Sequence, residues 1–86
     1  MHTVELLEQA IDTAGRLGYS IRHEFLGGVG GGSCEFGGRK WIFVDLALGP
    51  FEQLDQVCNA LTSDPGIHVV ELPDDLRGHL NLRQAA

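Results

Sequence analysis

The sequence has few basic residues and no long apolar run. Six lysines and arginines stand against twelve aspartates and glutamates, so the net charge is −6 at neutral pH. Such a charge repels the phosphate backbone of nucleic acids and the surface of anionic lipids. The longest apolar stretch, residues 41–44, is far shorter than the roughly 18 to 20 residues that cross a bilayer. The sequence therefore predicts no nucleic-acid partner and no membrane association.

Cysteine is also scarce. Cys34 and Cys58 fit no zinc-finger spacing and are too few for a disulfide framework, so we expect two buried, reduced thiols. The four histidines form no ligand pair at metal-binding spacing, and we expect neither a metal nor a cofactor. Residues 1–14 carry acidic residues in a helical pattern and no basic leader, which makes the cytoplasm the expected location.

Length and element order together predict the fold. A chain of 86 residues suffices for one domain, which we expect over residues 1–80, with a frayed tail over residues 81–86. The expected element order is α-β-β-β-α-β plus a short C-terminal helical turn. Because consecutive elements are joined by short connections, we predict an α+β fold with an antiparallel four-stranded sheet and two helices on one of its faces.

Local patterns predict where each element lies. Apolar residues that recur every three or four positions indicate amphipathic helices, and alternation of apolar and polar residues indicates strands. A proline at the first helical position and a glycine after the last one mark helix ends. The expected elements are a helix over residues 3–17, strands over 19–26, 33–36 and 39–46, a helix opened by Gly49 and Pro50, a strand over 67–72, and a short helical turn after Pro73.

Two consecutive glycines predict a tight hairpin. Residues 37–38 can adopt the two positive φ values that a type I′ turn requires. This turn places Glu35 opposite Lys40, a favourable charge pair, and Cys34 opposite Trp41, an apolar pair. A three-residue turn would instead shift this pairing by one residue. We favour the two-residue turn.

The glycine run over residues 27–32 has the composition of a phosphate-binding loop. Read from Gly28 and Gly30, however, the dinucleotide pattern G-x-G-x-x-G places Ser33 at its third glycine, and the lysine of a P-loop is absent. The run also leads from one strand into another, so no helix N-terminus is available for an anion. We expect a mobile connection at residues 30–32 and no phosphate site.

One hypothesis for function is a thiol-dependent enzyme. Cys34 follows the glycine run, whose free backbone N–H groups could stabilise an oxyanion. If the strands on either side of this run pair, His23 could serve as the base for a Cys34 nucleophile, and Asp45 could orient the imidazole. The opposing interpretation is that Cys34 is a small buried side chain and His23 an ordinary strand residue.

The strand at residues 41–44 is apolar on both faces, and two helices can cover only one of them. If the helices cover Ile42 and Val44, then Trp41 and Phe43, with Phe36 and Cys34, form a surface for a second copy or another protein. The alternative is that the C-terminal segment 76–80 folds across these aromatic residues. A non-enzymatic binding or assembly module, self-associating as a homodimer, is the function that we favour over the enzyme.

The sequence also resembles a group of small bacterial proteins that have a glycine-rich segment, a cysteine, a strand ending in aspartate and a closing leucine-proline pair. The matching features are residues 26–34 and 38–46, Glu52 with Gln53, and Leu72 with Pro73. The resemblance implies no activity, substrate, cofactor or catalytic residue.

Overall fold

The computed structural model describes residues 2–28 and 31–85, and within these ranges the chain forms three α-helices, one short 3₁₀ helix and three strands. Val29 and Gly30 of the glycine run, and Ala86 of the expected tail, lie outside the described residues. The elements are α1 (Thr3–Arg16), β1 (Tyr19–Glu24), β2 (Gly32–Phe36), β3 (Arg39–Asp45), α2 (Pro50–Ser63), η1 (Pro65–His68) and α3 (Asp74–Ala85).

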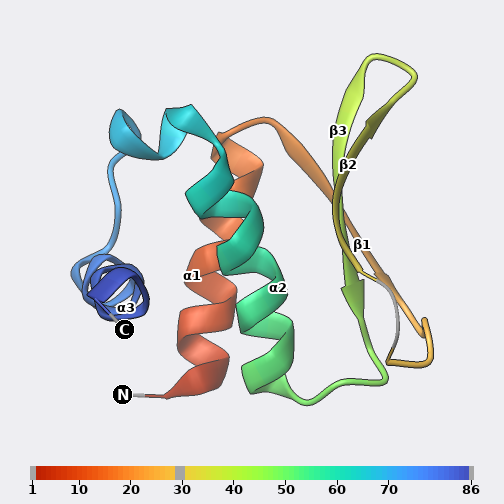
Figure 1. The fold of residues 1–86 in the computed structure, drawn as a ribbon, viewed down its shortest axis with the longest axis horizontal. Coiled ribbons are helices and arrows are strands. Elements are labelled where there is room, and N and C mark those ends of the chain that lie inside the picture. The colour runs from red at the N-terminus through yellow and green to blue at the C-terminus, as the bar shows by residue number, and fades with distance from the viewer. Residues whose placement is uncertain (1, 29–30, 86) are drawn as a thin grey trace.

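Figure 1 shows these elements in three layers, with the sheet on one side, α1 and α2 in the middle, and α3 on the far side from the sheet. Helices α1 and α2 pack side by side and cover one face of the sheet. The core lies between them, where Ile42 and Val44 of β3 are fully buried against Leu54 and Leu61 of α2 and Ala14 of α1. Among the described residues, no helix is long and apolar enough to span a membrane.

α1 begins and ends close to where the sequence predicts, and α2 begins where it predicts. α1 ends just before Gly18, whose φ of +96° is the left-handed conformation that commonly follows a helix. Its N-cap is His2, one residue before the expected Thr3. α2 begins with Pro50, and the Glu52 carboxylate accepts a hydrogen bond from the backbone N–H of Gly49 at 2.9 Å.

The hairpin prediction is confirmed. Glu35 pairs with Lys40 and Cys34 with Trp41, as the two-residue turn requires. The turn glycines at 37 and 38 have φ values of +63° and +75°, which fit type I′. Local turn chemistry is therefore sufficient to set the register of β2 on β3.

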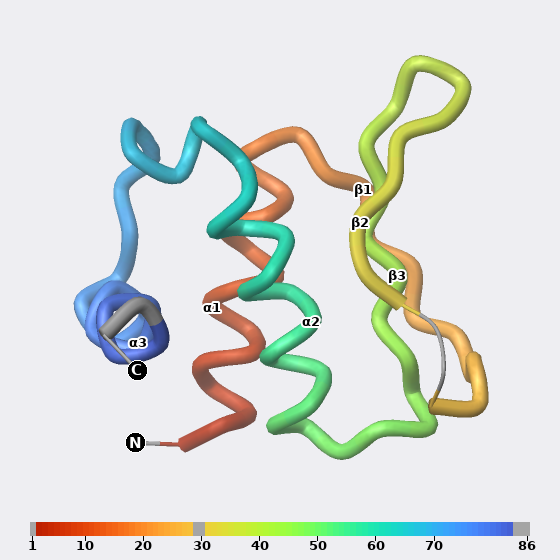
Figure 2. Tube along the Cα trace, viewed as in Figure 1, coloured from red at the N-terminus to blue at the C-terminus, as the bar shows by residue number. Residues whose placement is uncertain are grey.

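The predicted antiparallel four-stranded sheet is wrong. The described residues form a mixed three-stranded sheet in the order β1-β3-β2, in which β1 pairs with β3 in parallel and β2 pairs with β3 in antiparallel fashion. β1 and β2 are consecutive in sequence, yet they lie on opposite edges with β3 between them. The connection from β1 to β2 therefore passes the end of β3, at the lower right of Figures 1 and 2. The α+β class itself is confirmed.

The strand predicted over residues 67–72 is absent from the described structure, which has η1 and irregular chain there. The residues just before and at the start of this segment explain the difference. The Asp64 side chain accepts a hydrogen bond from the backbone N–H of Gly66 at 2.8 Å, and Pro65 fixes the first position of the 3₁₀ turn. Turn chemistry therefore overrides the β-branched residues that follow.

The short C-terminal turn of the prediction is a twelve-residue helix. α3 spans Asp74–Ala85 and therefore includes most of the segment 81–86, which we expected to be a frayed tail. Leu76 and Leu80 are buried in the core, and α3, which carries them, lies on the far side of the helical layer from the sheet (Figure 1). The alternative in which segment 76–80 covers the aromatic face of β3 is therefore wrong.

The crossing of the glycine connection over β3 gives a first prediction. A Cβ at Gly31, where φ is +125°, would overlap the Gln56 side chain and lie 3.1 Å from the carbonyl oxygen of Phe43. A Cβ at Gly32, where φ is +107°, would meet nothing within 4 Å. We expect Gly32→Ala to lower the free energy of unfolding by about 1–2 kcal/mol through backbone strain alone. Gly31→Ala should cost at least about 1 kcal/mol more because of crowding.

Urea unfolding followed by circular dichroism measures both losses. Equal losses for the two variants would contradict the close approach of Gly31 to α2.

Candidate functional site

The open face of the sheet is the main candidate site. Side chains alternate along β3, so the buried Ile42 and Val44 point toward the helices and Trp41 and Phe43 point the other way. Register places Cys34 of β2 beside Trp41 on this outer face. We call the outer surface of Phe36, Trp41 and Phe43 the aromatic face.

The three rings of the aromatic face form a row. The ring centroids of Phe36 and Trp41 lie 6.2 Å apart, and those of Trp41 and Phe43 lie 6.3 Å apart, with interplanar angles of 24° and 23°. The Arg39 guanidinium lies 5.1 Å from the centroid of the Trp41 ring and donates to Ser20 Oγ at 3.2 Å. Arg39 thus holds one end of the row against β1. Sequence patterning did not identify this role.

Charges of both signs surround the aromatic face. Arg22 pairs with Glu24 at 2.7 Å on β1, and both share the outer face of the sheet because they stand two residues apart on one strand. Arg39 adds a second positive charge. The outer face therefore carries both signs, although the whole chain is strongly acidic.

No described element covers the aromatic face. α1 and α2 lie against the opposite face, and α3 lies beyond them (Figure 1). Phe36 is 66% exposed, and Trp41 and Phe43 are half-buried. An apolar row at the centre of a sheet face is unusual on a surface that stays in water.

Asp45 anchors the connection that places β3 in the middle of the sheet. Its fully buried carboxylate accepts backbone N–H bonds from Leu26 and Ala47 at 2.9 Å and from Gly28 at 2.7 Å. Burial alone raises the pKa of a carboxyl group, but these three bonds outweigh it and hold the pKa of Asp45 below its usual value. The backbone N–H of Asp45 in turn donates to Gln56 Oε1 of α2 at 3.1 Å.

A second carboxylate joins the other end of the sheet to the end of α2. Asp64 Oδ2 accepts from the Tyr19 hydroxyl at 2.9 Å and from Lys40 Nζ at 3.0 Å. The backbone bond from Gly66, followed by the bonds from Lys40 and Tyr19, lowers the pKa of Asp64. Burial, followed by the bond to Asp64, raises the pKa of Tyr19 to about 12. This cluster is internally satisfied and serves the fold.

The structure does not bring the three residues of the enzyme hypothesis together. β1 and β2 lie on either side of β3, so His23 and Cys34 are two strand spacings apart, or roughly 10 Å, before any offset along the strands. In the strand register, His23 pairs with Val44, whose side chain points to the helices. Cys34 pairs with Trp41, whose side chain points to the outer face. The Asp45 carboxylate is engaged by the three backbone N–H groups.

The two thiols differ, and the expected burial of Cys34 is wrong. Cys34 is exposed and Cys58 is fully buried. The two-residue turn correctly paired Cys34 with Trp41, but turn chemistry does not determine that this pair lies on the uncovered face. Burial raises the pKa of the Cys58 thiol to about 11.

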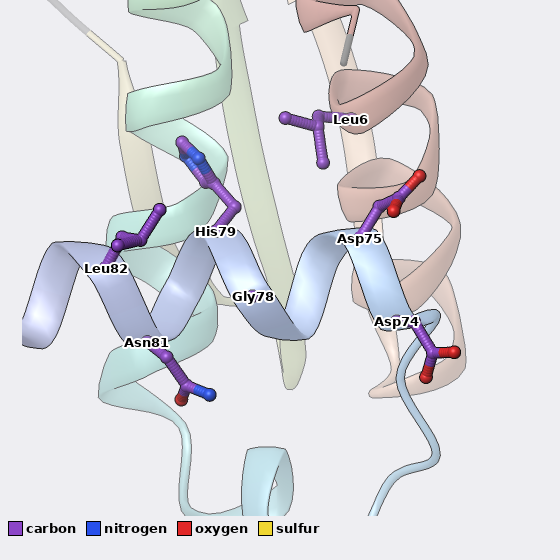
Figure 3. A pocket seen from close by; sticks show the side chains of 7 residues that line it. All are labelled: Leu6, Asp74, Asp75, Gly78, His79, Asn81 and Leu82. Carbon is purple, nitrogen blue, oxygen red and sulfur yellow. The ribbon is translucent and has the colours of Figure 1, made fainter.

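A hollow of about 690 Å³ lies beside α3, and Figure 3 shows the side chains around it. It is lined by Leu6 of α1 and by Asp74, Asp75, Gly78, His79, Asn81 and Leu82 of α3. A Cβ at Gly78 would meet nothing within 4 Å, so the space beside this position is open. Among the described residues, no group of three or more His, Cys, Asp or Glu side chains is placed to hold a metal ion.

Comparisons of the chain with protein-family models, with curated proteins and with solved structures find no match. The resemblance to small glycine-rich bacterial proteins therefore stays an expectation.

The difference between the two thiols gives a second prediction. In the folded protein at neutral pH, diluted until it is monomeric, a maleimide should label Cys34 quickly and leave Cys58 unlabelled, because Cys58 is buried and its pKa is raised. Labelling of Cys58 should follow only on unfolding in denaturant. Mass spectrometry of the digested protein measures both rates. Equal native rates for the two thiols would contradict the burial of Cys58.

The lowered pKa values of Asp45 and Asp64 give a third prediction, on stability in acid. Each carboxylate stabilises the fold above its unfolded pKa near 3.8 and loses this contribution as the pH falls through its lower folded value. Asp45→Asn removes one acceptor carboxylate. We expect the melting temperature of this variant to lie well below that of the wild type at neutral pH, and the gap to narrow below about pH 4.

Thermal melts followed by circular dichroism measure this gap, with Asp12→Asn as the control at an exposed carboxylate. A gap that is independent of pH would contradict the anchoring role of the ionised Asp45.

Proposed function

We propose that the protein is a non-enzymatic assembly module that associates with a second copy of itself through the aromatic face. The observation that carries this proposal is the uncovered row of Phe36, Trp41 and Phe43 on a sheet whose other face packs against α1 and α2 (Figure 1). A sheet that is apolar on both faces is stable in water when both faces are covered.

The energy available from this face is sufficient for a modest interface. An aromatic side chain buries roughly 150 to 250 Å² in full, and burial of apolar area contributes about 25 cal/mol/Å². Phe36 still exposes most of its surface, and Trp41 and Phe43 expose a smaller part. Covering the row on two copies therefore contributes several kcal/mol, which has to exceed the cost of association.

A second copy fits this face by shape, and the charge that opposes the contact is small. Two arginines and one glutamate surround the rings, and because Arg22 is paired with Glu24, each face brings one net positive charge, that of Arg39. Two sheets that pack face to face are held about 10 Å apart by interdigitated side chains, and a row of three rings supplies such side chains. An isologous contact of this kind closes as a dimer.

The enzyme hypothesis has less support. The exposed Cys34 is the only part of it that the geometry favours, because His23 lies across the sheet on the other face and Asp45 is engaged by backbone N–H groups. A thiol with no base beside it is a weak basis for catalysis.

A fourth prediction tests the aromatic face. Phe36→Glu and Trp41→Glu should each raise the dissociation constant of the dimer at least about tenfold, because a carboxylate is costly in an apolar interface and cheap on an open surface. Sedimentation equilibrium measures the constants. Far-UV circular dichroism should stay close to that of the wild type.

Phe51→Glu is the matched control, because Phe51 is 63% exposed, much like Phe36, but lies on α2. This variant should associate as the wild type does. A wild type that is monomeric at high concentration, or a loss of association in Phe51→Glu equal to that in Phe36→Glu, would overturn the proposal.

A further inference from the structure

β2 is an edge strand with a free side. Within the described residues it pairs only with β3, and every residue from Ser33 to Phe36 is exposed. The unpaired backbone groups of such an edge are a template for another strand. Natural edges are commonly protected by proline, by lysine and other charged side chains, by a bulge or by being short. β2 is five residues long and carries Glu35, but it has no proline, lysine or bulge.

The turn determines which backbone groups face the free side. The two residues that flank a two-residue type I′ turn form a hydrogen-bonded pair, and such pairs alternate with non-bonded pairs along an antiparallel ladder. By this rule Phe36, Cys34 and Gly32 direct their N–H and C=O groups toward β3. Ser33 and Glu35 direct theirs toward the free side.

A second β2 strand in antiparallel orientation fits one register best. When the two-fold axis passes through Cys34, all five residues pair. Ser33 then lies opposite the partner's Glu35, and Glu35 lies opposite the partner's Ser33. In both pairs the free N–H and C=O groups face each other. An axis at Glu35 would place two carboxylates directly opposite each other, which is unfavourable. An axis at Ser33 would leave Phe36 beyond the end of the partner strand.

We propose that the free side of β2 pairs with β2 of a second copy in the register centred on Cys34, which joins two sheets into one of six strands. The surface is the edge formed by Gly32–Phe36, and the occupant is the same edge of another chain. Four backbone hydrogen bonds form, two for each pair of Ser33 with the partner's Glu35.

The side chains on both faces fit this register. Phe36 lies opposite the partner's Gly32, so the ring can cover a position that has no side chain. Cys34 lies opposite the partner's Cys34 in a non-hydrogen-bonded pair, where Cα atoms are about 4.5 Å apart and a disulfide is geometrically allowed. Ser33 can donate its hydroxyl to the carboxylate of the partner's Glu35.

Edge pairing is separate from the contact proposed for the aromatic face. It uses the backbone of β2, and it leaves both aromatic faces on the same side of the joined sheet and open. A chain that uses both surfaces builds an assembly larger than a dimer, because each surface recruits a different copy.

Opposite charges at Ser33 test the register. Ser33→Lys places an ammonium group opposite the partner's Glu35 twice in each dimer, whereas Ser33→Glu places a carboxylate there twice. We expect Ser33→Lys to lower the dissociation constant and Ser33→Glu to raise it, each by about three- to tenfold at low salt. The same two substitutions at Ser63, an exposed serine at the end of α2, control for the change in net charge.

Oxidation provides a second test that does not depend on these variants. Diamide takes up the two electrons and two protons that two thiols lose, and it should link Cys34 directly to the partner's Cys34. Crosslinking should be at least about tenfold faster than in the double variant Cys34→Ser/Glu35→Cys, whose thiols face the partner's Ser33. Mass spectrometry of the non-reduced digest identifies the link.

The outcomes separate the two proposals. If Ser33→Lys and Ser33→Glu change the dissociation constant and Trp41→Glu does not, edge pairing is supported and the aromatic-face dimer is overturned. If Trp41→Glu raises the dissociation constant and neither Ser33→Lys nor Ser33→Glu changes it, edge pairing alone is overturned. A bifunctional thiol crosslinker with a spacer of about 10 Å gives a further test. If it links the two Cys34 side chains and diamide does not, edge pairing is also overturned, because sheets that pack face to face are about that distance apart. A strictly monomeric wild type overturns both.

Discussion

The fold depends on one buried carboxylate at the end of the central strand. β1 and β2 follow each other in the chain, and the connection between them has to pass the end of β3 for β3 to take the central position. Asp45 fixes this crossing by accepting backbone N–H bonds from Leu26, Gly28 and Ala47. Glycines allow the connection to lie close to α2, where a Cβ at Gly31 would overlap the Gln56 side chain. The parallel pairing of β1 with β3 follows from this anchor.

That arrangement also determines which surfaces the chain offers to others. With β3 in the centre, Trp41 lies in the middle of the outer sheet face, and β2 becomes an edge with a free side. α3 adds its buried leucines to the far side of the helical layer and covers neither surface. A domain of 86 residues thus places its helices on one side only. Both proposed contacts use surfaces that this one-sided layering leaves uncovered.

Local signals in the sequence predicted the parts of the fold that local chemistry controls. Glycines 37 and 38 fix the hairpin register, and Pro50 with Glu52 fixes the start of α2. The parallel pair was missed because it depends on contacts between Asp45 and residues 17 to 19 positions earlier, which no local pattern contains. Alternation identified Trp41, Phe43 and Phe36 as a set, but could not decide that Cys34 beside them is exposed. Arg39 was missed because its contact with Trp41 depends on the side-chain position at the hairpin end.

Trp41 is the only tryptophan in the chain, so its fluorescence reports directly on the centre of the aromatic face. The most direct measurement of the central claim is tryptophan emission and acrylamide quenching of the wild type over a wide range of protein concentration. If a second copy covers the aromatic face, dilution shifts the emission to longer wavelength and increases quenching as Trp41 becomes exposed. Emission and quenching that stay constant while sedimentation shows the protein dissociating would contradict the claim, because the interface would then lie away from Trp41.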